Sequence, residues 1–286
     1  QQAIEKGACV ILFNQDSTAF QDLQKLSAIE WIEVANLADK LAEIAARFYN
    51  YPARNLDIIG ITGTNGKTSC SQFLAQLLTD SMVIGTLGFG TWGKVEFTGY
   101  TTPNAIMLQK ILAETVALGK KTVVMEVSSH GVQEKRIEQT LFKGAVFTNL
   151  SRDHLDYHNS MEEYFNAKLQ LFKRSELEFA VINQDDSKGQ QIIAALAPSV
   201  SLWTFTRQPH TGLARCVQAK NIRCSINGIT FEVGCDNQTA VINSRLYGEF
   251  NVENMLAVLT TLLALGFNLN EAAEKISALQ SVSGRM

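Results

Sequence analysis

Short apolar runs alternate with amphipathic segments along most of the chain. The apolar runs predict buried strands at residues 56–61, 82–86, 121–127, 145–148 and 179–183. Between them, apolar residues recur with helical spacing at 67–78, 105–117 and 161–172. Continuous apolar strands that alternate with helices are typical of a parallel sheet covered on both faces. The pattern therefore predicts an α/β fold with a mostly parallel central sheet flanked by helices.

The pattern changes near residue 200. Four runs read as successive strands, at 200–205, 214–226, 230–233 and 241–246. Asn227-Gly228 is a dipeptide typical of a tight hairpin turn between two of them. We therefore expect a small antiparallel sheet packed beside the main one. Two amphipathic helices, at 252–265 and 270–279, are predicted to close the chain.

The first fifty residues form a separate pattern. Short strands are predicted at 9–13 and 31–34, followed by a helix at 36–49. The expected apolar face of that helix consists of Leu37, Leu41, Ile44, Ala45 and Phe48. We interpret residues 1–50 as the end of a small α/β N-terminal domain and 51–286 as a central domain.

Composition narrows the class of partner. The 286 residues carry a net charge of −3, which gives no reason to expect a nucleic-acid partner. No apolar stretch reaches the length of a membrane span, so we expect no membrane partner. The five cysteines are scattered without Cys-x-x-Cys spacing, which is typical of free thiols in a reducing compartment. We therefore expect a cytoplasmic protein.

A glycine-rich loop is the strongest local signal for chemistry. Gly60-Ile-Thr-Gly-Thr-Asn-Gly-Lys-Thr68 follows a predicted buried strand and leads into a predicted helix. In that position, backbone N–H groups and the start of the helix attract phosphate oxygens. Lys67 would reach the β- and γ-phosphates, and the Thr68 hydroxyl would bind Mg²⁺. The glycine spacing differs from the standard Walker pattern, because Ile61 stands six residues before Lys67.

The segment from residue 62 to residue 68 resembles the ATP loop of the Mur ligases and of their folate and cyanophycin relatives. That resemblance implies an enzyme that forms an acyl phosphate from a carboxylate and ATP, which an amine then attacks. It implies a catalytic role for Lys67. It also implies that ATP is bound by Gly63, Thr64, Asn65, Gly66, Lys67, Thr68 and Ser69.

Two further segments resemble the substrate sites of this family. Met-Glu-Val-Ser-Ser-His-Gly at 125–131 ends a predicted strand, where α/β proteins bind ligands. The resemblance places Glu126 on magnesium and Ser128 on a UDP-sugar peptide. It assigns the same substrate to Thr101, Thr102 and Arg136, and to Glu134, which stands where the family often has Gln.

Residues 148–158 contain two histidines, His154 and His158, four residues apart. That spacing alone would allow a zinc site, although no third ligand is evident. The resemblance instead places His154 on a second Mg²⁺ in a catalytic role and leaves His158 structural. The next predicted helix carries Lys168, which composition alone would make a surface lysine. In similar ligases this lysine is carbamylated by CO₂, and the resulting anion suits magnesium. That reaction needs a neutral amine and so a lowered pKa.

Two C-terminal segments resemble nucleotide contacts. In Gly-Glu-Phe-Asn-Val-Glu-Asn at 248–254, Asn251 and Asn254 fit positions near the adenine of ATP, with a helix N-cap as the structural alternative. Ser-Gly-Arg-Met at 283–286 places Arg285 near the γ-phosphate as a catalytic cation.

Within the family, these segments are most similar to the ligases that add a diamino acid to UDP-MurNAc-L-Ala-D-Glu, with meso-diaminopimelate favoured over L-lysine. The partners implied are ATP, this UDP-linked peptide and the diamino acid, in a monomeric enzyme. The family's C-terminal amino-acid-binding domain and the start of its first domain are not recognisable in the chain, which begins with Gln1. We therefore expect a fragment that binds ATP but is inactive alone. The alternatives are another Mur-type ligase, a folylpolyglutamate synthase or a non-ligating P-loop ATPase module.

Overall fold

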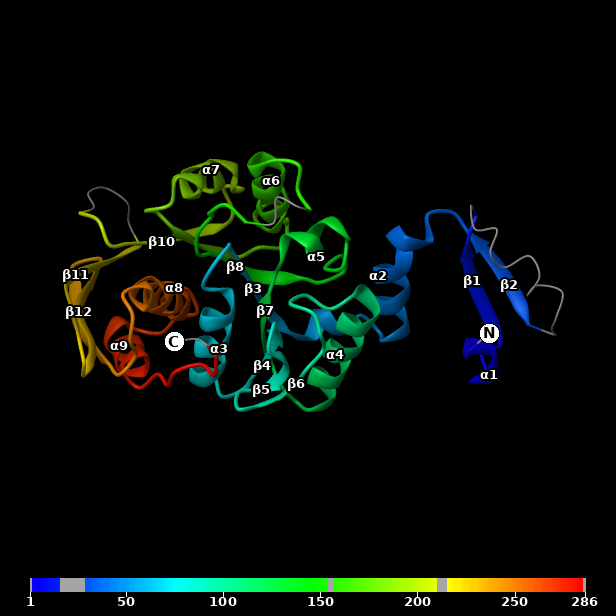
Figure 1. The fold of residues 1–286 in the computed structure, drawn as a ribbon, viewed down its shortest axis with the longest axis horizontal. Coiled ribbons are helices and arrows are strands. Elements are labelled where there is room, and N and C mark those ends of the chain that lie inside the picture. The colour runs from blue at the N-terminus through cyan, green and yellow to red at the C-terminus, as the bar shows by residue number, and fades with distance from the viewer. Residues whose placement is uncertain (1, 16–28, 154–156, 210–214, 285–286) are drawn as a thin grey trace.

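The computed structural model describes residues 2–15, 29–153, 157–209 and 215–284 (Figure 1). A small N-terminal unit stands apart from the main body, joined to it through α2. The unit contains α1 (Gln2–Glu5) and two parallel strands, β1 (Val10–Asn14) and β2 (Glu30–Val34). Helix α2 (Leu37–Phe48) and the short 3-10 helix η2 (Pro52–Asn55) follow, and both pack on α4 (Ala105–Ala117).

The buried face of α2 differs from the predicted one. Its buried residues are Ala42, Ala45 and Ala46, whereas Phe48 is 79% exposed. Ala45 belongs to the predicted face, whereas Ala42 and Ala46 were missed. Alanines permit the close approach of α2 to a neighbouring helix. The helix itself agrees with the prediction at 36–49.

The main body is built on one sheet of eleven strands, in the order β13-β12-β11-β10-β9-β8-β3-β7-β4-β5-β6. Its strands are β3 (Asp57–Thr62), β4 (Ser81–Gly85), β5 (Gly88–Thr91), β6 (Lys94–Glu96), β7 (Thr122–Glu126), β8 (Phe142–Phe147), β9 (Phe179–Asn183), β10 (Ser201–Thr206), β11 (Cys216–Ser225), β12 (Gly228–Cys235) and β13 (Gln238–Ser244). In this spatial order, all neighbouring strands in the run β11-β10-β9-β8-β3-β7-β4 are parallel to each other. The parallel α/β sheet predicted from the sequence is confirmed.

The antiparallel strands at the C-terminal end continue the main sheet and do not form a sheet of their own, which corrects the prediction. Strand β10 pairs in parallel with both β9 and β11, and only then do β12 and β13 follow antiparallel. The reason is a helix that the sequence reading missed, α7 (Ser187–Ala195), whose N-cap Asp186 accepts from Lys188 N. A helix between β9 and β10 supplies the crossover that parallel strands require.

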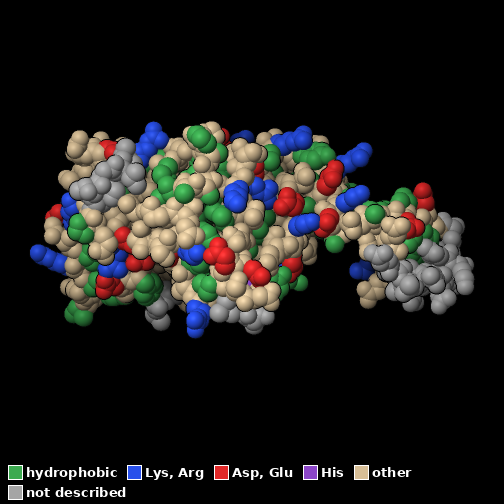
Figure 2. Space-filling view, turned by 90° about the horizontal axis from the view of Figure 1, so that it is seen from above, with side chains coloured by type: hydrophobic (Ala, Val, Ile, Leu, Met, Phe, Trp, Pro, Cys, Tyr) green, Lys and Arg blue, Asp and Glu red, His purple; other side chains and the backbone are tan. Residues whose placement is uncertain are grey.

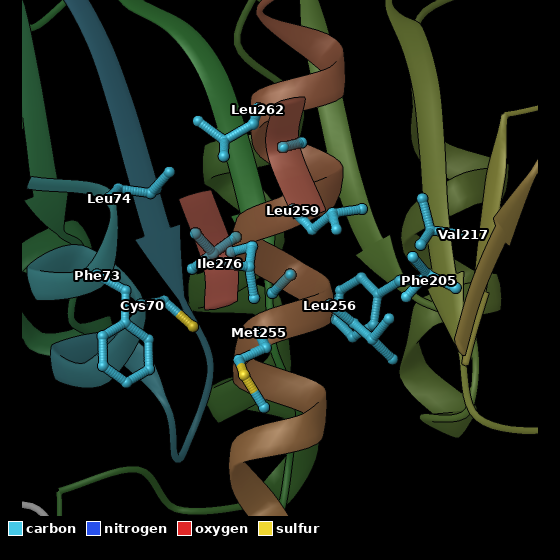
Figure 3. Packing of buried hydrophobic residues seen from close by; sticks show 14 of the residues in the cluster. Cys70, Phe73, Leu74, Phe205, Val217, Met255, Leu256, Leu259, Leu262 and Ile276 are labelled. Carbon is cyan, nitrogen blue, oxygen red and sulfur yellow. The ribbon is translucent and has the colours of Figure 1, made fainter. Parts of the chain in front are cut away.

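Helices cover both faces of the sheet. They are α3 (Lys67–Leu77), α4 (Ala105–Ala117), α5 (Ser129–Gln133), α6 (Met161–Phe172), α7, α8 (Phe250–Ala264) and α9 (Leu269–Ser277). In Figure 1 the sheet separates α6 and α7 from α3, α8 and α9. Figure 3 shows α8 in the middle of one core, between Leu74 of α3 and Val217 of β11. The other core joins α4, α6 and α7 to the opposite face.

The arrangement of the strands has a consequence for the site. The carboxyl ends of β3, β4, β7, β8, β9 and β10 share one edge of the sheet, where parallel α/β folds place their ligands.

On the face shown in Figure 2, basic and acidic side chains lie interspersed over the main body. Within the described ranges, every helix is too short or too polar to cross a bilayer.

Candidate active site

The phosphate loop connects β3 to α3 as predicted, and its glycines are required by close contacts. Gly63 has φ +150°, and a Cβ there would lie 1.9 Å from Thr148 Oγ1. Gly66, the N-cap residue of α3, has φ +86°, and a Cβ there would lie 2.5 Å from Asn254 Oδ1. Both conformations are in a region that only glycine adopts freely. The loop is thus pressed between the end of β8 and the start of α8.

Residues that follow β8 hold the loop in place. Thr64 N donates to Asn149 O at 2.8 Å, and Asn65 N donates to Asn149 Oδ1 at 2.9 Å. Thr148 Oγ1 donates to Asn65 O at 2.6 Å. The sequence reading drew attention to this segment for its histidines and missed Thr148 and Asn149. Their position at the end of the strand predicted at 145–148 was the available signal.

Two lysines meet at the loop. Lys67 Nζ donates to Gly63 O and to Thr64 O, both at 2.8 Å, and Lys168 Nζ donates to the same Gly63 O at 2.9 Å. Lys168, on α6, is 1% exposed, and its Nζ lies 4.3 Å from the centre of the Tyr164 ring. Burial lowers the pKa of Lys168 well below its usual range, and the charge of Lys67 lowers it further, against the opposing effect of Asp153. The lysine predicted for carbamylation is therefore a buried amine that favours its neutral form.

Glu126, at the end of β7, is fully buried beside the loop. Its carboxylate accepts from Thr68 Oγ1 at 2.9 Å, from Thr86 N at 2.9 Å and from Thr86 Oγ1 at 3.1 Å. Burial raises the pKa of Glu126, while the Thr86 N–H and the charge of Lys67 partly offset that rise. Gly85 makes room for this carboxylate, since a Cβ there would lie 2.1 Å from Glu126 Oε1. Thr86, which follows β4, was missed by the sequence reading.

A hydrogen-bonded chain links Glu126 to the proposed substrate residues. Thr102 Oγ1 donates to Glu126 O at 2.9 Å and accepts from Ser128 N and Ser128 Oγ, each at 3.0 Å. Ser128 also caps α5 by accepting from Gly131 N. Thr101 Oγ1 lies 3.0 Å from Thr86 Oγ1. The paired threonines and Ser128 are therefore brought together at the strand ends.

Arg136 lies beside this chain with its guanidinium fixed on two sides. Nη1 donates to Thr102 O at 2.7 Å. Nε and Nη2 both donate to Glu134 Oε2, at 2.9 and 2.6 Å. The Tyr100 ring lies 5.3 Å from the guanidinium carbon. Glu134 thus contacts the site through Arg136.

These groups surround a polar cavity of about 340 Å³. Its lining includes Lys67, Thr68, Thr86, Tyr100, Thr101, Thr102, Glu126, Ser128, Arg136 and Lys168. A second cavity, of about 400 Å³, lies on the other side of the loop. It is lined by Asn65, Gly66, Ser69, Asn149, Phe250, Glu253, Asn254 and Gly284. The loop therefore borders two spaces, one rich in cations and one next to α8.

Of the two asparagines near the C-terminal end, Asn254 faces the loop and Asn251 supports it. Asn254 Nδ2 donates to Asn251 Oδ1 at 3.1 Å, and Asn251 Nδ2 donates to Tyr247 O at 2.7 Å. The structural alternative of an asparagine N-cap is wrong, because the N-cap residue of α8 is Glu249. Of the pair, only Asn254 lines the second cavity. The predicted residue Arg285 lies outside the described residues.

Metal ligands can be judged from the donor chemistry. The Thr68 hydroxyl and the Glu126 carboxylate are hard oxygen donors beside the phosphate loop, a set that fits Mg²⁺. In the described part of the chain, no three His, Cys, Asp or Glu side chains gather as a metal cluster. His154 lies outside the described residues. His158 is buried, with Nε2 2.8 Å from Ser129 Oγ and its ring 5.1 Å from that of Tyr164, so its contacts are those of a packed core residue.

Comparison with known proteins places this geometry in a family. Residues 61–262 match the model of the Mur ligase middle domain. The chain is 40% identical over 293 residues to the UDP-N-acetylmuramoyl-L-alanyl-D-glutamate–2,6-diaminopimelate ligase of Coxiella burnetii, a match that covers 100% of this chain and 59% of that protein. The chain thus spans little more than half the length of the curated relatives that it matches.

Solved structures agree. A structure of a UDP-N-acetylmuramoyl-L-alanyl-D-glutamate–2,6-diaminopimelate ligase superposes with a TM-score of 0.84 at 28% identity, covering 97% of this chain and 61% of that one. A MurF ligase from Thermotoga maritima in complex with ADP shares the fold at 18% identity, with a TM-score of 0.68, covering 99% of this chain and 60% of that one. The family match spans most of the main sheet, including the phosphate loop, Glu126 and Lys168. The chain belongs to the Mur ligase family.

Proposed function

We propose that this chain forms the ATP-binding core of a ligase of the MurE type, which joins a diamino acid to UDP-MurNAc-L-Ala-D-Glu. The observation that carries the proposal is the first cavity. It brings phosphate-loop residues Lys67 and Thr68 together with Glu126, and it adds Arg136 as a cation from the segment that follows α5. An enzyme that phosphorylates a carboxylate needs these two groups of residues to face one another.

The loop would bind the triphosphate. Backbone N–H groups at the start of α3 and the ammonium of Lys67 would neutralise the phosphates. Lys67 is held over the loop by hydrogen bonds to Gly63 O and Thr64 O, so it is already placed there. Thr68 and Glu126 would hold Mg²⁺, which when bound neutralises charge on the phosphates. We assign the adenine side to Asn254, with Asn251 as its support.

We propose that Lys168 is carbamylated. Its neutral amine would attack the carbon of CO₂ and lose one proton, which forms an N–C bond and leaves a carbamate anion. The reaction is favoured because it places an anion, instead of a neutral amine, beside the ammonium of Lys67. The carbamate oxygens would join His154 as ligands of a second Mg²⁺, and Arg285 would approach the γ-phosphate.

The acceptor substrate would lie against Thr101, Thr102, Ser128 and Arg136, with Glu134 holding the arginine. The glutamate carboxylate attacks the γ-phosphorus, and ADP leaves with its electron pair. The amine of the diamino acid then attacks the acyl phosphate, loses a proton and releases phosphate. This chain's residues contribute by binding, orienting and neutralising charge.

We favour meso-diaminopimelate as the amino acid, which is supported by relatives of 40% identity that are named as 2,6-diaminopimelate ligases. We assign residues 1–50 to the end of a UDP-substrate domain and 51–286 to the ATP-binding domain, in a monomer. The amino acid would be bound by a part of the enzyme outside this chain. A reaction that consumes ATP also fits the expected cytoplasmic location.

The test is phosphate release by the complete protein with Mg-ATP, UDP-MurNAc-L-Ala-D-Glu and meso-diaminopimelate. We expect release only when all three are present, and a loss on Arg136→Ala. Arg174→Ala is the matched control, since both arginine side chains are 17% exposed and both bond a glutamate and a backbone carbonyl. Release that needs no acceptor would indicate a simple ATPase. Release with a folate or another UDP-peptide would assign the chain to the other ligases considered.

A further inference from the structure

The second cavity differs in character from the first. Asn65, Gly66 and Ser69 line both, so a nucleotide on the loop would reach from one into the other. Among the described residues that line the second cavity, there is no lysine or arginine. A space without cations, next to a phosphate-binding loop, suits the uncharged part of a nucleotide.

Two side chains of α8 give this cavity a recognition surface. The Phe250 ring is 52% exposed although it lies in the first turn of a largely buried helix. Glu253, one turn further on, also lines the cavity. An open aromatic face can stack on a planar base, and a carboxylate accepts hydrogen bonds from N–H or O–H groups.

Glu253 is held in place by Arg207, which follows β10. Arg207 Nη1 donates to Glu253 Oε1 at 3.2 Å, and Nη2 donates to Glu249 Oε1. Arg207 is itself anchored, because its backbone N donates to Asp185 Oδ2 at 2.7 Å. The ends of β9 and β10 therefore fix a carboxylate at the edge of the sheet that carries the phosphate loop.

The contrast with Glu249 argues against a simple surface ion pair. Both glutamates bond the same arginine, but the Glu249 side chain is 63% exposed and does not line the cavity. The Glu253 side chain is 35% exposed and does. Within the described part of the chain, Arg207 contacts Glu253 through Oε1, which leaves Oε2 available to accept. Arg207 also offsets two negative charges that would otherwise repel a triphosphate.

We propose that Glu253, positioned by Arg207, is the hydrogen-bond acceptor that recognises the nucleoside part of the nucleotide. The donors are either the hydroxyl groups of the sugar or the amino group of the base. This inference rests on the proposed function, because it takes the triphosphate to lie on the loop at Lys67.

The test is calorimetric binding of Mg-ATP to the complete protein, comparing wild type with Glu253→Ala and Glu249→Ala. A hydrogen bond to a charged group at a partly open site predicts a Kd about tenfold weaker for Glu253→Ala. Glu249→Ala, which removes the same charge and the same kind of ion pair, should bind within about twofold of wild type. Glu253→Gln keeps the shape of the side chain and one acceptor oxygen, so it should lose less affinity for Mg-ATP than Glu253→Ala. This variant controls for a folding defect in Glu253→Ala.

Nucleotide analogues identify the donor. If Glu253 accepts from the sugar, 2′-deoxy- or 3′-deoxy-ATP should bind wild type and Glu253→Ala equally. If it accepts from the base, purine riboside triphosphate, which lacks the 6-amino group, should be the analogue that binds wild type and Glu253→Ala equally. A Glu253→Ala loss that is the same for all four nucleotides, or no larger than that of Glu249→Ala, overturns the inference. A wild-type protein that does not bind Mg-ATP at all overturns the proposed function instead.

Discussion

Lys168→Met should stabilise the protein at neutral pH, and the gain should disappear as the pH rises. The wild-type amine is 1% exposed, and its pKa is lowered by burial and by Lys67. Folding at neutral pH must therefore remove a proton that the unfolded chain keeps. Methionine has a similar length and no charge, so the variant avoids that step. The hydrogen bond to Gly63 O is lost, but this carbonyl keeps the Lys67 donor.

The sign and slope follow from proton linkage. Between the lowered pKa of folded Lys168 and the value of 10.5 for an ordinary lysine, the unfolded wild-type chain binds more protons than the folded one. Over that window, the free energy of unfolding of wild type rises by about 1.4 kcal/mol per pH unit relative to the variant. Above it, the lost hydrogen bond should leave the variant about 1 kcal/mol less stable.

The assay is urea unfolding of both proteins between about pH 7 and pH 10, in buffers freed of CO₂ so that no carbamate forms. Lys173→Met is the matched control, since Lys173 follows the same helix and is exposed. We expect the control to track wild type across the range. An advantage of Lys168→Met that stays constant or grows with pH would refute the reasoning. Adding bicarbonate should stabilise wild type alone.

Three further outcomes test the geometry. Gly85→Ala places a methyl group 2.1 Å from Glu126 Oε1, so calorimetry should show loss of Mg²⁺-dependent ATP binding while circular dichroism shows a retained fold. Asn268 is the N-cap residue of α9, and its side chain accepts from Glu271 N at 2.9 Å. Asn268→Ala should therefore lower the free energy of unfolding by about 1 kcal/mol. Burial raises the pKa of Cys235 to about 12, so a thiol reagent at neutral pH should modify native protein quickly at two exposed cysteines and only slowly elsewhere. Those two are Cys9 and Cys224.

The sequence predicted the strands and helices of the parallel sheet well because each carries a strong local pattern. Strand β3 is a continuous apolar run, and α6 has clear helical spacing. The sequence was less informative about the arrangement of strands whose position depends on their pairing partners. Whether β10 joins β9 or a separate sheet depends on α7, a nine-residue helix with only two buried residues. The hairpin of β5 and β6 was missed because it is short, two of its seven residues are glycine, and all three residues of β6 are exposed.

For the site, residue type and position after a strand were enough to identify the main groups. Lys67, Thr68 and Glu126 lie together as expected. The sequence could not show that Thr86 shares the carboxylate of Glu126, because the two are 40 residues apart and only the pairing of β4 with β7 joins them. Nor could it show that Lys168 is buried, since its helix reads as a surface helix until α5 and α7 pack on it.

The phosphate loop is arranged at the expense of stability, and this links its binding to its fold. Lys67 and Lys168 donate to one carbonyl, Gly63 O, so two amines share a single acceptor, and the Lys168 amine does so while buried. Glu126 is buried nearby with a raised pKa, so its negative charge is also disfavoured. An anion between the lysines, with a divalent cation at Glu126, would reverse each of these penalties. Ligand binding should therefore stabilise the folded chain through these three side chains. Lys168→Met should be more stable than wild type without added Mg-ATP, and it should lose part of the stabilisation that Mg-ATP confers.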